Sequence, residues 1–156
     1  MTRNVRAVAV IVVALIGLPA LVVSAAWLSG LPEPDRSPAD ADYLWQPLDI
    51  SDGARLALGL AATVLAASAI VLLWRWFKLG RITRTIMIVL TAIGAIAAYG
   101  GSMYGVASAP VIGANIGGGL MLLAAGPFVA GTVAVAVVAV VQQRRRTAVD
   151  RRDLQA

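Results

Sequence analysis

Two residue types are missing from this chain of 156 residues, which contains no cysteine and no histidine. Without them the chain has no disulfide, no thiolate nucleophile and no imidazole ligand for zinc or haem. Ser24, Ser68, Ser102 and Ser108 have neither a histidine nor a nearby lysine to activate them as nucleophiles. We therefore expect a protein without catalytic activity and without a cofactor.

Charge is also scarce, since only 13% of the residues are charged and the mean hydropathy is +0.84. A water-soluble domain of this length needs more polar surface to cover its core. Residues 7–28 and 56–74 are uncharged, and so are residues 85–143, which are long enough for two spans. A membrane span needs about 20 apolar residues. The sequence predicts a single four-span domain over residues 1–156, an all-α integral membrane four-helix bundle with helices at about 7–29, 56–75, 84–107 and 118–142.

No carboxylate and no histidine lies within the four apolar segments. Ionisable groups inside a membrane mark ion paths and proton relays. Their absence counts against a proton-coupled exporter of the small four-helix class, and equally against a self-contained proton channel.

The charges that are present are distributed unevenly, although the formal net charge is +5 and the pI is about 10.7. Six of the eight acids lie between the first and second apolar segments, with only Arg36 and Arg55 as cations there. The remaining cations flank the other ends of the apolar segments, as the positive-inside rule requires. We predict both termini in the cytoplasm (N-in/C-in), an acidic proline-rich extracytoplasmic loop at 31–51 and a basic cytoplasmic tail at 143–156. Because topology accounts for the basic charge, we expect no nucleic-acid partner.

The first apolar segment has a second interpretation, since Arg3 and Arg6 precede it and Val23-Ser24-Ala25 is a small-residue sequence of the kind that ends a secretory signal. The apolar run is longer than the about 7–15 residues usual for a signal. We therefore expect a retained membrane helix.

The loop at 31–51 contains four prolines and should be extended. We expect Tyr43, Leu44 and Trp45 to return to the membrane interface, and Ser51 or Asp52 to cap the next helix. Its acid pairs, Asp40 with Asp42 and Asp49 with Asp52, match no calcium loop, so we expect no metal site. Tryptophan favours the interface, and the predicted interfacial anchors are Trp27, Trp45, Trp74 and Trp76.

Small residues recur on one face of the second and third helices, and membrane helices associate through such faces. We predict that these two faces pack on each other or on a partner. The predicted helix-packing residues are Gly59, Thr63, Ala66, Thr91, Ala98, Gly101, Ser102, Gly105, Gly113, Gly117 and Gly118.

The glycine-rich sequence APVIGANIGGGL, residues 109–120, raises the question of a phosphate site. It lacks the Lys-Ser/Thr of a phosphate loop and has no preceding strand. Pro110 should end the third helix, and Asn115 should satisfy backbone groups in the turn. We therefore interpret the stretch as an uncharged external turn that leads into a packing surface.

Two prolines, Pro19 and Pro127, lie within predicted helices and should kink them. The tail after Gln143 has charges of both signs and no apolar periodicity, so we expect it to be frayed. Anionic lipid heads attract cations beside a span, which predicts a secondary lipid contact at Arg144, Arg145 and Arg146.

These features favour a non-catalytic accessory or structural subunit of a respiratory, transport or envelope-building complex, with other membrane proteins as partners. The excess of arginine over lysine suits a bacterial source, and hence a plasma-membrane location. The alternative is a homo-oligomeric channel or small-solute facilitator lined by the third helix. It is favoured by polar residues near the outer end of the last two helices, namely Tyr99, Ser102, Tyr104, Ser108 and Asn115.

Overall fold

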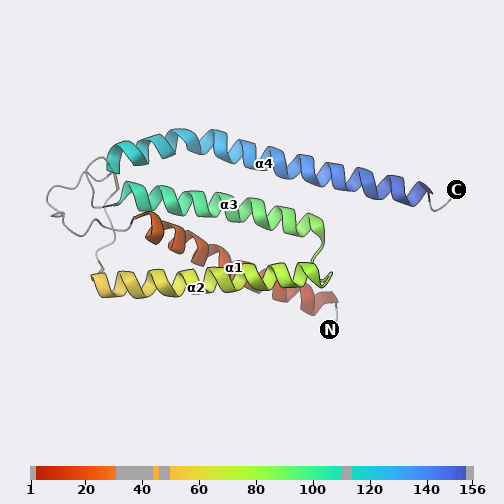
Figure 1. Cartoon of the computed structure of the whole chain (residues 1–156), viewed down its shortest axis with the longest axis horizontal. Helices are drawn as coiled ribbons and strands as arrows, with labels where there is room; N and C mark the ends of the chain where they lie inside the picture. Colours follow the sequence, from red (N-terminus) through yellow and green to blue (C-terminus); the bar gives the residue numbers. More distant parts are fainter. Residues whose placement is uncertain (1–2, 31–43, 46–49, 110–113, 154–156) are drawn as a thin grey trace.

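The computed structural model describes residues 3–30, 44–45, 50–109 and 114–153. This part of the chain forms four α-helices (Figure 1), which are α1 (Arg3–Ser29), α2 (Asp52–Lys78), α3 (Arg84–Ala107) and α4 (Ala114–Asp153). All four contain a stretch that is long and apolar enough to cross a membrane. For the described residues, the prediction of an all-α fold with four helices long and apolar enough to span a membrane is confirmed.

The helices run alternately up and down, so the two ends of the bundle differ in character. The α2–α3 turn and the start of α1 lie at one end, together with Lys78, Arg81, Arg84 and Arg144. We name this the basic end. The opposite end, where α1 finishes and α2 begins, is the loop end (Figure 1).

The centre of the bundle is α1, which packs against both α2 and α3, while α4 packs against α3. Figure 1 shows α1 crossing between α2 and α3, and these two helices barely touch each other. The predicted faces of α2 and α3 do not pack on each other, because Gly59 of α2 and both Gly101 and Gly105 of α3 meet α1 instead. A short turn keeps two helix ends close together, yet it does not determine which way either helix is rotated.

Local capping explains where α2 and α3 begin. The Ser51 hydroxyl accepts a hydrogen bond from the Ala54 N–H at 3.3 Å, and the Thr83 hydroxyl accepts one from the Ile86 N–H at 3.3 Å. Both satisfy N–H groups that a helix start leaves without a partner. Between the two helices Gly80 adopts a φ of 66°, a conformation that glycine reaches without a Cβ clash.

The fourth helix is longer than the predicted 118–142, since it begins at Ala114 and continues to Asp153. The expectation of a frayed tail is therefore wrong for the described residues. After Gly131 the sequence contains neither glycine nor proline, and glutamine and arginine are good helix formers. The helix also continues through Pro127, as α1 does through Pro19, and Figure 1 shows α4 as a bowed rod.

The buried positions of the bundle are occupied mainly by small residues. Alanines at positions 20, 62, 66, 69, 107, 109 and 114 are buried, whereas none of the described residues is a large side chain that is fully buried. Leu, Ile and Val side chains face outward on every helix. Small residues inside and large apolar residues outside is the arrangement of helices that pack closely in lipid.

Candidate functional site

The contact between α1 and α3 depends on two glycines one helical turn apart, Gly101 and Gly105. A Cβ on Gly101 would overlap the carbonyl group of Val22, and one on Gly105 would overlap the carbonyl group of Ala26. Both glycines are buried. The obstacles are backbone atoms of α1, so no side-chain rotation could relieve the overlap. This is the close approach that a Gly-x-x-x-Gly sequence permits.

The contact between α1 and α2 combines close packing with a hydrogen-bonded pair. The ring of Trp27 lies directly over Gly59, and a Cβ on Gly17 would lie 2.6 Å from the Cβ of Ala69. The Ser24 and Thr63 hydroxyl oxygens are 2.8 Å apart, and the Thr63 hydroxyl donates to the Gly59 carbonyl at 2.8 Å. Because a hydroxyl has one proton to donate, Ser24 is the donor to Thr63.

Sequence reasoning missed the contribution of α1 to both of these contacts. Gly17, Ala20 and Ser24 recur at a helical spacing of three and four residues, which was the available signal. From the sequence, Ser24 is a possible nucleophile and part of a possible signal-cleavage sequence, but it is not predicted as a packing residue. The proline at position 19 within the same segment also drew attention to a kink rather than to a packing face.

At the loop end α4 approaches α3 through its first turns. A Cβ on Gly117 would lie 2.9 Å from a methyl carbon of Val106, and one on Gly118 would lie 2.7 Å from the Cβ of Ala107. Two loop residues close this end, because the N–H groups of Leu44 and Trp45 both donate to the Ala107 carbonyl, at 3.0 and 3.1 Å. Leu44 and Trp45, which we predict to return to the membrane interface, thus contact α3 directly, and Tyr43 lies outside the described residues.

The other predicted packing residues have separate positions. Ala66 is buried on α2, whereas Ala98 and Ser102 are half-buried on α3. Thr91 is exposed and its hydroxyl donates to the Met87 carbonyl of its own helix. Gly113 lies outside the described residues. The small residues of α3 therefore do not form one continuous contact, since Gly101 and Gly105 face α1 while Thr91 lines a groove toward α4.

The four tryptophans predicted as interfacial anchors divide into two groups. Trp27 covers Gly59, and Trp45 stacks on Tyr104 with ring centroids 6.2 Å apart, so both contact the bundle itself. Trp74 is exposed at the basic end, where the Lys78 ammonium lies 5.1 Å from its ring centroid. Trp76 is half-buried on the same turn of α2. A Trp–Lys pair beside a span suits the membrane interface.

The cations predicted to contact lipid heads are only partly described. Arg144 and Arg145 are exposed on α4, and the side chain of Arg146 lies outside the described residues. The loop carboxylates Asp40, Asp42 and Asp49 also lie outside them. Within the described part of the chain, no three residues of the His, Cys, Asp and Glu types gather as a metal site would require.

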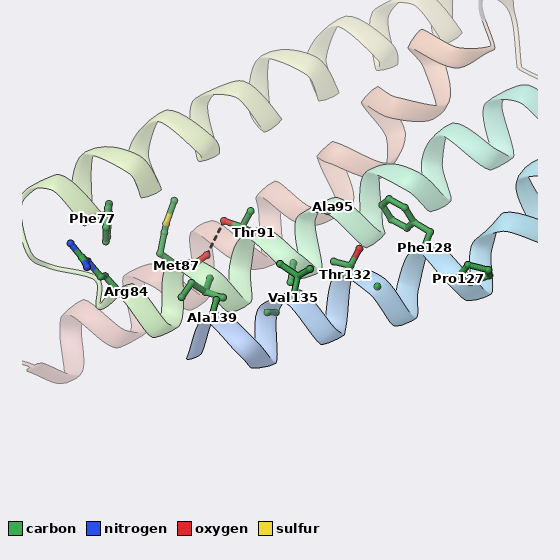
Figure 2. Close-up of a pocket in the computed structure, with 14 residues that line it drawn as sticks. Phe77, Arg84, Met87, Thr91, Ala95, Pro127, Phe128, Thr132, Val135 and Ala139 are labelled. Carbon is green, nitrogen blue, oxygen red and sulfur yellow. Dashed lines mark hydrogen bonds between the residues drawn. The ribbon is translucent and has the colours of Figure 1, made fainter. Parts of the chain in front are cut away.

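A groove of about 770 Å³ lies between α3 and α4 (Figure 2). Phe77 and Arg84 lie at its basic end, and Phe128 lies at its other end. Between them the walls are apolar or small, formed by Met87, Ile88, Thr91, Ala92, Ala95, Pro127, Gly131, Thr132, Val135, Ala136 and Ala139. We call this hollow the α3–α4 groove.

Two contacts hold α3 and α4 together beyond the ends of this groove. Tyr99 stacks on Phe128 with centroids 4.3 Å apart, and its hydroxyl donates to the Met121 carbonyl at 2.5 Å. Toward the basic end the Thr85 hydroxyl donates to the Gln143 side-chain oxygen at 3.4 Å. The groove lies between these two contacts, where many of the facing residues are alanine, glycine or threonine.

A second hollow of about 120 Å³ lies among α1, α2 and α3 at the loop end. Trp27, Arg55, Tyr104 and Ser108 are its main polar lining residues. The Ser108 hydroxyl is occupied, since it donates to the Tyr104 carbonyl at 2.7 Å. The volume is below the about 300–1,000 Å³ of small-molecule sites, so this hollow is a packing defect of the loop end rather than a ligand pocket.

Four apolar helices around a core of alanine and glycine define the class of this chain as a multi-pass α-helical membrane protein. No protein-family model matches the chain, and no curated protein or solved structure is significantly similar to it. A function must therefore be argued from the surfaces that the bundle leaves open.

Proposed function

We propose that the chain is a non-catalytic accessory or structural subunit of a larger membrane complex. The observation that carries this proposal is an open stripe of small residues on α4. Gly126, Ala130 and Ala134 follow one another at a spacing of four, and all three are exposed. Nothing lies within 4 Å of the place where a Cβ on Gly126 would be. A small-x-x-x-small sequence of this kind favours close approach of a second membrane helix.

The stripe faces away from the rest of the bundle. At 3.6 residues per turn its three residues lie within about 80° of one another, on the side of α4 opposite Phe128, Thr132 and Val135. Those three line the groove toward α3. The stripe therefore belongs to the lipid-facing side of α4, where a helix of another protein has free access.

The internal use of the other small residues supports the same proposal. Gly17, Gly59, Gly101 and Gly105 all meet α1 or a residue packed on it, so they have no surface left for a partner. This moves the proposed partner contact from α2 and α3, where the sequence had placed it, to α4. The Gly126 signal was present in the sequence, but the adjacent Pro127 drew attention to a kink instead.

We further propose that the basic end faces the cytoplasm of a bacterial cell, with the loop at 31–51 outside. Lys78, Arg81, Arg84 and Arg144 share one end of the bundle, as the positive-inside rule requires of cytoplasmic segments. The channel hypothesis has less support, because the Gly101–Gly105 face of α3 is occupied by α1 and the opposite part of α3 faces α4.

The experiment is purification of the tagged chain from its native membrane in mild detergent, followed by identification of the co-purifying proteins. Ala130→Leu should release the partner, because leucine holds the two helices apart. Ala67→Leu, the same change at an exposed site on α2, should retain it. A wild-type product that contains only this chain, or equal retention by both variants, would contradict the proposal.

A further inference from the structure

We propose that the α3–α4 groove binds one anionic phospholipid, with an acyl chain between the two helices and the phosphate on Arg84. This site is independent of the partner contact proposed above, which lies on the opposite side of α4. It is also distinct from the surface contact expected at Arg144–Arg146.

The chemistry of the groove matches an amphiphile with a negative head. Arg84 is the only charged residue among the fourteen that line it, and it lies at one end. The rest of the lining is apolar apart from two threonines, and the Thr91 hydroxyl is already bonded to the Met87 carbonyl. An apolar channel that ends at one cation complements a hydrocarbon tail that ends at one anion.

Arg84 is free to take such a partner. Its side chain is exposed, and it makes no ion pair or hydrogen bond with the part of the chain that the structure describes. The sequence contains no aspartate or glutamate between Asp52 and Asp150. No carboxylate near Arg84 in the sequence therefore competes with a phosphate for its guanidinium group. A guanidinium group binds a phosphate through paired hydrogen bonds.

The dimensions of the groove fit one leaflet of a bilayer. The stretch from Arg84 to Ala95 covers about 16 Å of α3, at about 1.5 Å per residue. Half of a hydrocarbon core of about 30 Å is about 15 Å. With Arg84 at the level of the lipid heads, the groove thus runs from the membrane surface to the middle of the bilayer. Its volume of about 770 Å³ also lies within the about 300–1,000 Å³ of ligand sites.

The same dimensions disfavour a transmembrane helix as the occupant. The Tyr99–Phe128 stack closes the groove at the end away from Arg84. A membrane helix from another protein needs a contact surface that continues through both leaflets, whereas an acyl chain needs only one. The groove is open sideways, because Thr91, Gly131 and Val135 in its walls are exposed, so a lipid reaches it directly from the bilayer.

The test uses the purified full chain in nanodiscs of dioleoylphosphatidylcholine with increasing amounts of dioleoylphosphatidylglycerol. Lipid that remains bound after release from the disc is counted by native mass spectrometry. Wild-type protein should retain one phosphatidylglycerol in preference to phosphatidylcholine. Arg84→Gln should reduce that preference by about fivefold, the loss expected for one surface cation. Arg81→Gln, which removes a neighbouring exposed cation that does not line the groove, should leave the preference unchanged.

A second pair of variants tests the acyl chain. Ala136→Phe fills the groove and should abolish retention of either lipid, whereas Val137→Phe, at an exposed site on the opposite side of α4, should not. If Ala136→Phe does not fold, the comparison of Arg84→Gln with Arg81→Gln still tests the proposal. Both arginines are exposed, so neither substitution should prevent folding. Equal losses in Arg84→Gln and Arg81→Gln, no preference in the wild type, or retention by a folded Ala136→Phe would each overturn the proposal. So would binding of soluble glycerol phosphate as tight as that of the lipid, because the tail would then contribute nothing.

Discussion

The first and last helices of this bundle both contain an apolar stretch with small residues, but they differ in how they are packed. α1 lies between α2 and α3 and meets them through glycine and alanine, so that backbone approaches backbone at Gly101 and Gly105. α4 contacts only α3 among the described helices, and it leaves both a groove and an open small-residue stripe. The difference indicates that α1 organises the fold, while α4 offers surfaces for something outside the chain.

Small residues serve both helices, but with opposite consequences. On α1 and its neighbours they are covered, so each glycine shortens a helix–helix distance within the chain. On α4 they are exposed, so they allow a helix of another protein to approach α4 closely. Composition alone does not separate these two cases, because Gly105 and Gly126 both sit among apolar neighbours. The comparison predicts that equal substitutions have unequal effects in the two places.

The largest effect is expected at the α1–α3 contact. Gly105→Leu places a side chain against the carbonyl group of Ala26, and neither backbone can move away without separating the helices. We expect a loss of at least about 3 kcal/mol in the free energy of unfolding, the upper part of the usual range for overpacking. The measurement is unfolding in mixed micelles followed by circular dichroism.

The matched control for that variant is Gly100→Leu, five residues earlier on the same helix. Nothing lies within 4 Å of the place where its Cβ would be. It should cost less than about 1 kcal/mol, since a glycine within a helix is itself unfavourable. Similar losses in the two variants would show that α1 is not the packing centre.

A smaller effect is expected where α4 begins. Gly118→Leu meets the Cβ of Ala107 and the side chain of Leu44, and the latter has room to rotate. We expect a loss of about 1–2 kcal/mol, with Gly119→Leu, which faces open space, close to neutral. Hydrogen exchange should show faster opening of α4 in Gly118→Leu while α1 keeps its protection. Equal loss of protection in both helices would remove the distinction between them.

The polar contact of α1 should contribute less than its close packing. Ser24→Ala removes the hydrogen bond to Thr63, and such bonds in membrane proteins are worth about 0.6 kcal/mol on average and about 1.7 at most. We expect the free energy of unfolding to fall by about 1 kcal/mol, because the Ser24 side chain is buried. A double-mutant cycle with Thr63→Val isolates the pair, and Ser68→Ala at an exposed site of α2 is the control. Additive losses in the cycle would mean that the two hydroxyls do not interact.

The smallest effect is expected at the contact that closes the α3–α4 groove. Tyr99→Phe keeps the ring stacked on Phe128 and removes only the hydrogen bond to the Met121 carbonyl. We expect a loss of about 0.5 kcal/mol in unfolding free energy. Tyr104→Phe should be neutral, because its ring stacks on Trp45 and no described residue binds its hydroxyl. A larger loss for Tyr104→Phe than for Tyr99→Phe would contradict this assignment.

Much of the local structure could be read from the sequence because it depends on neighbouring residues. The apolar lengths predict four membrane helices, and the Ser51 cap follows from a hydroxyl placed before a helix-forming run. The same reasoning failed for the tail, where the absence of apolar periodicity was given more weight than the helix propensity of glutamine and arginine. A helix that leaves the bilayer needs no apolar face to remain a helix.

Which faces meet was decided only in three dimensions. The sequence identified Gly59, Gly101 and Gly105 as small residues fit for close packing, but it predicted that the faces of α2 and α3 pack on each other or on a partner, and it did not indicate α1. The structure places α1 between them, through contacts such as Ser24 with Thr63 that join residues far apart in the chain.

What the sequence by itself determined, then, is that the chain has four apolar helices with small residues where they pack, because length, hydropathy and capping act over a few residues. The tertiary structure alone decided that α1 is central, that α3 and α4 enclose a groove ending at Arg84, and that Gly126 stays open. These properties depend on how each helix is rotated about its own axis. Many weak contacts between small residues together determine that rotation. No single sequence pattern predicts which of these contacts form.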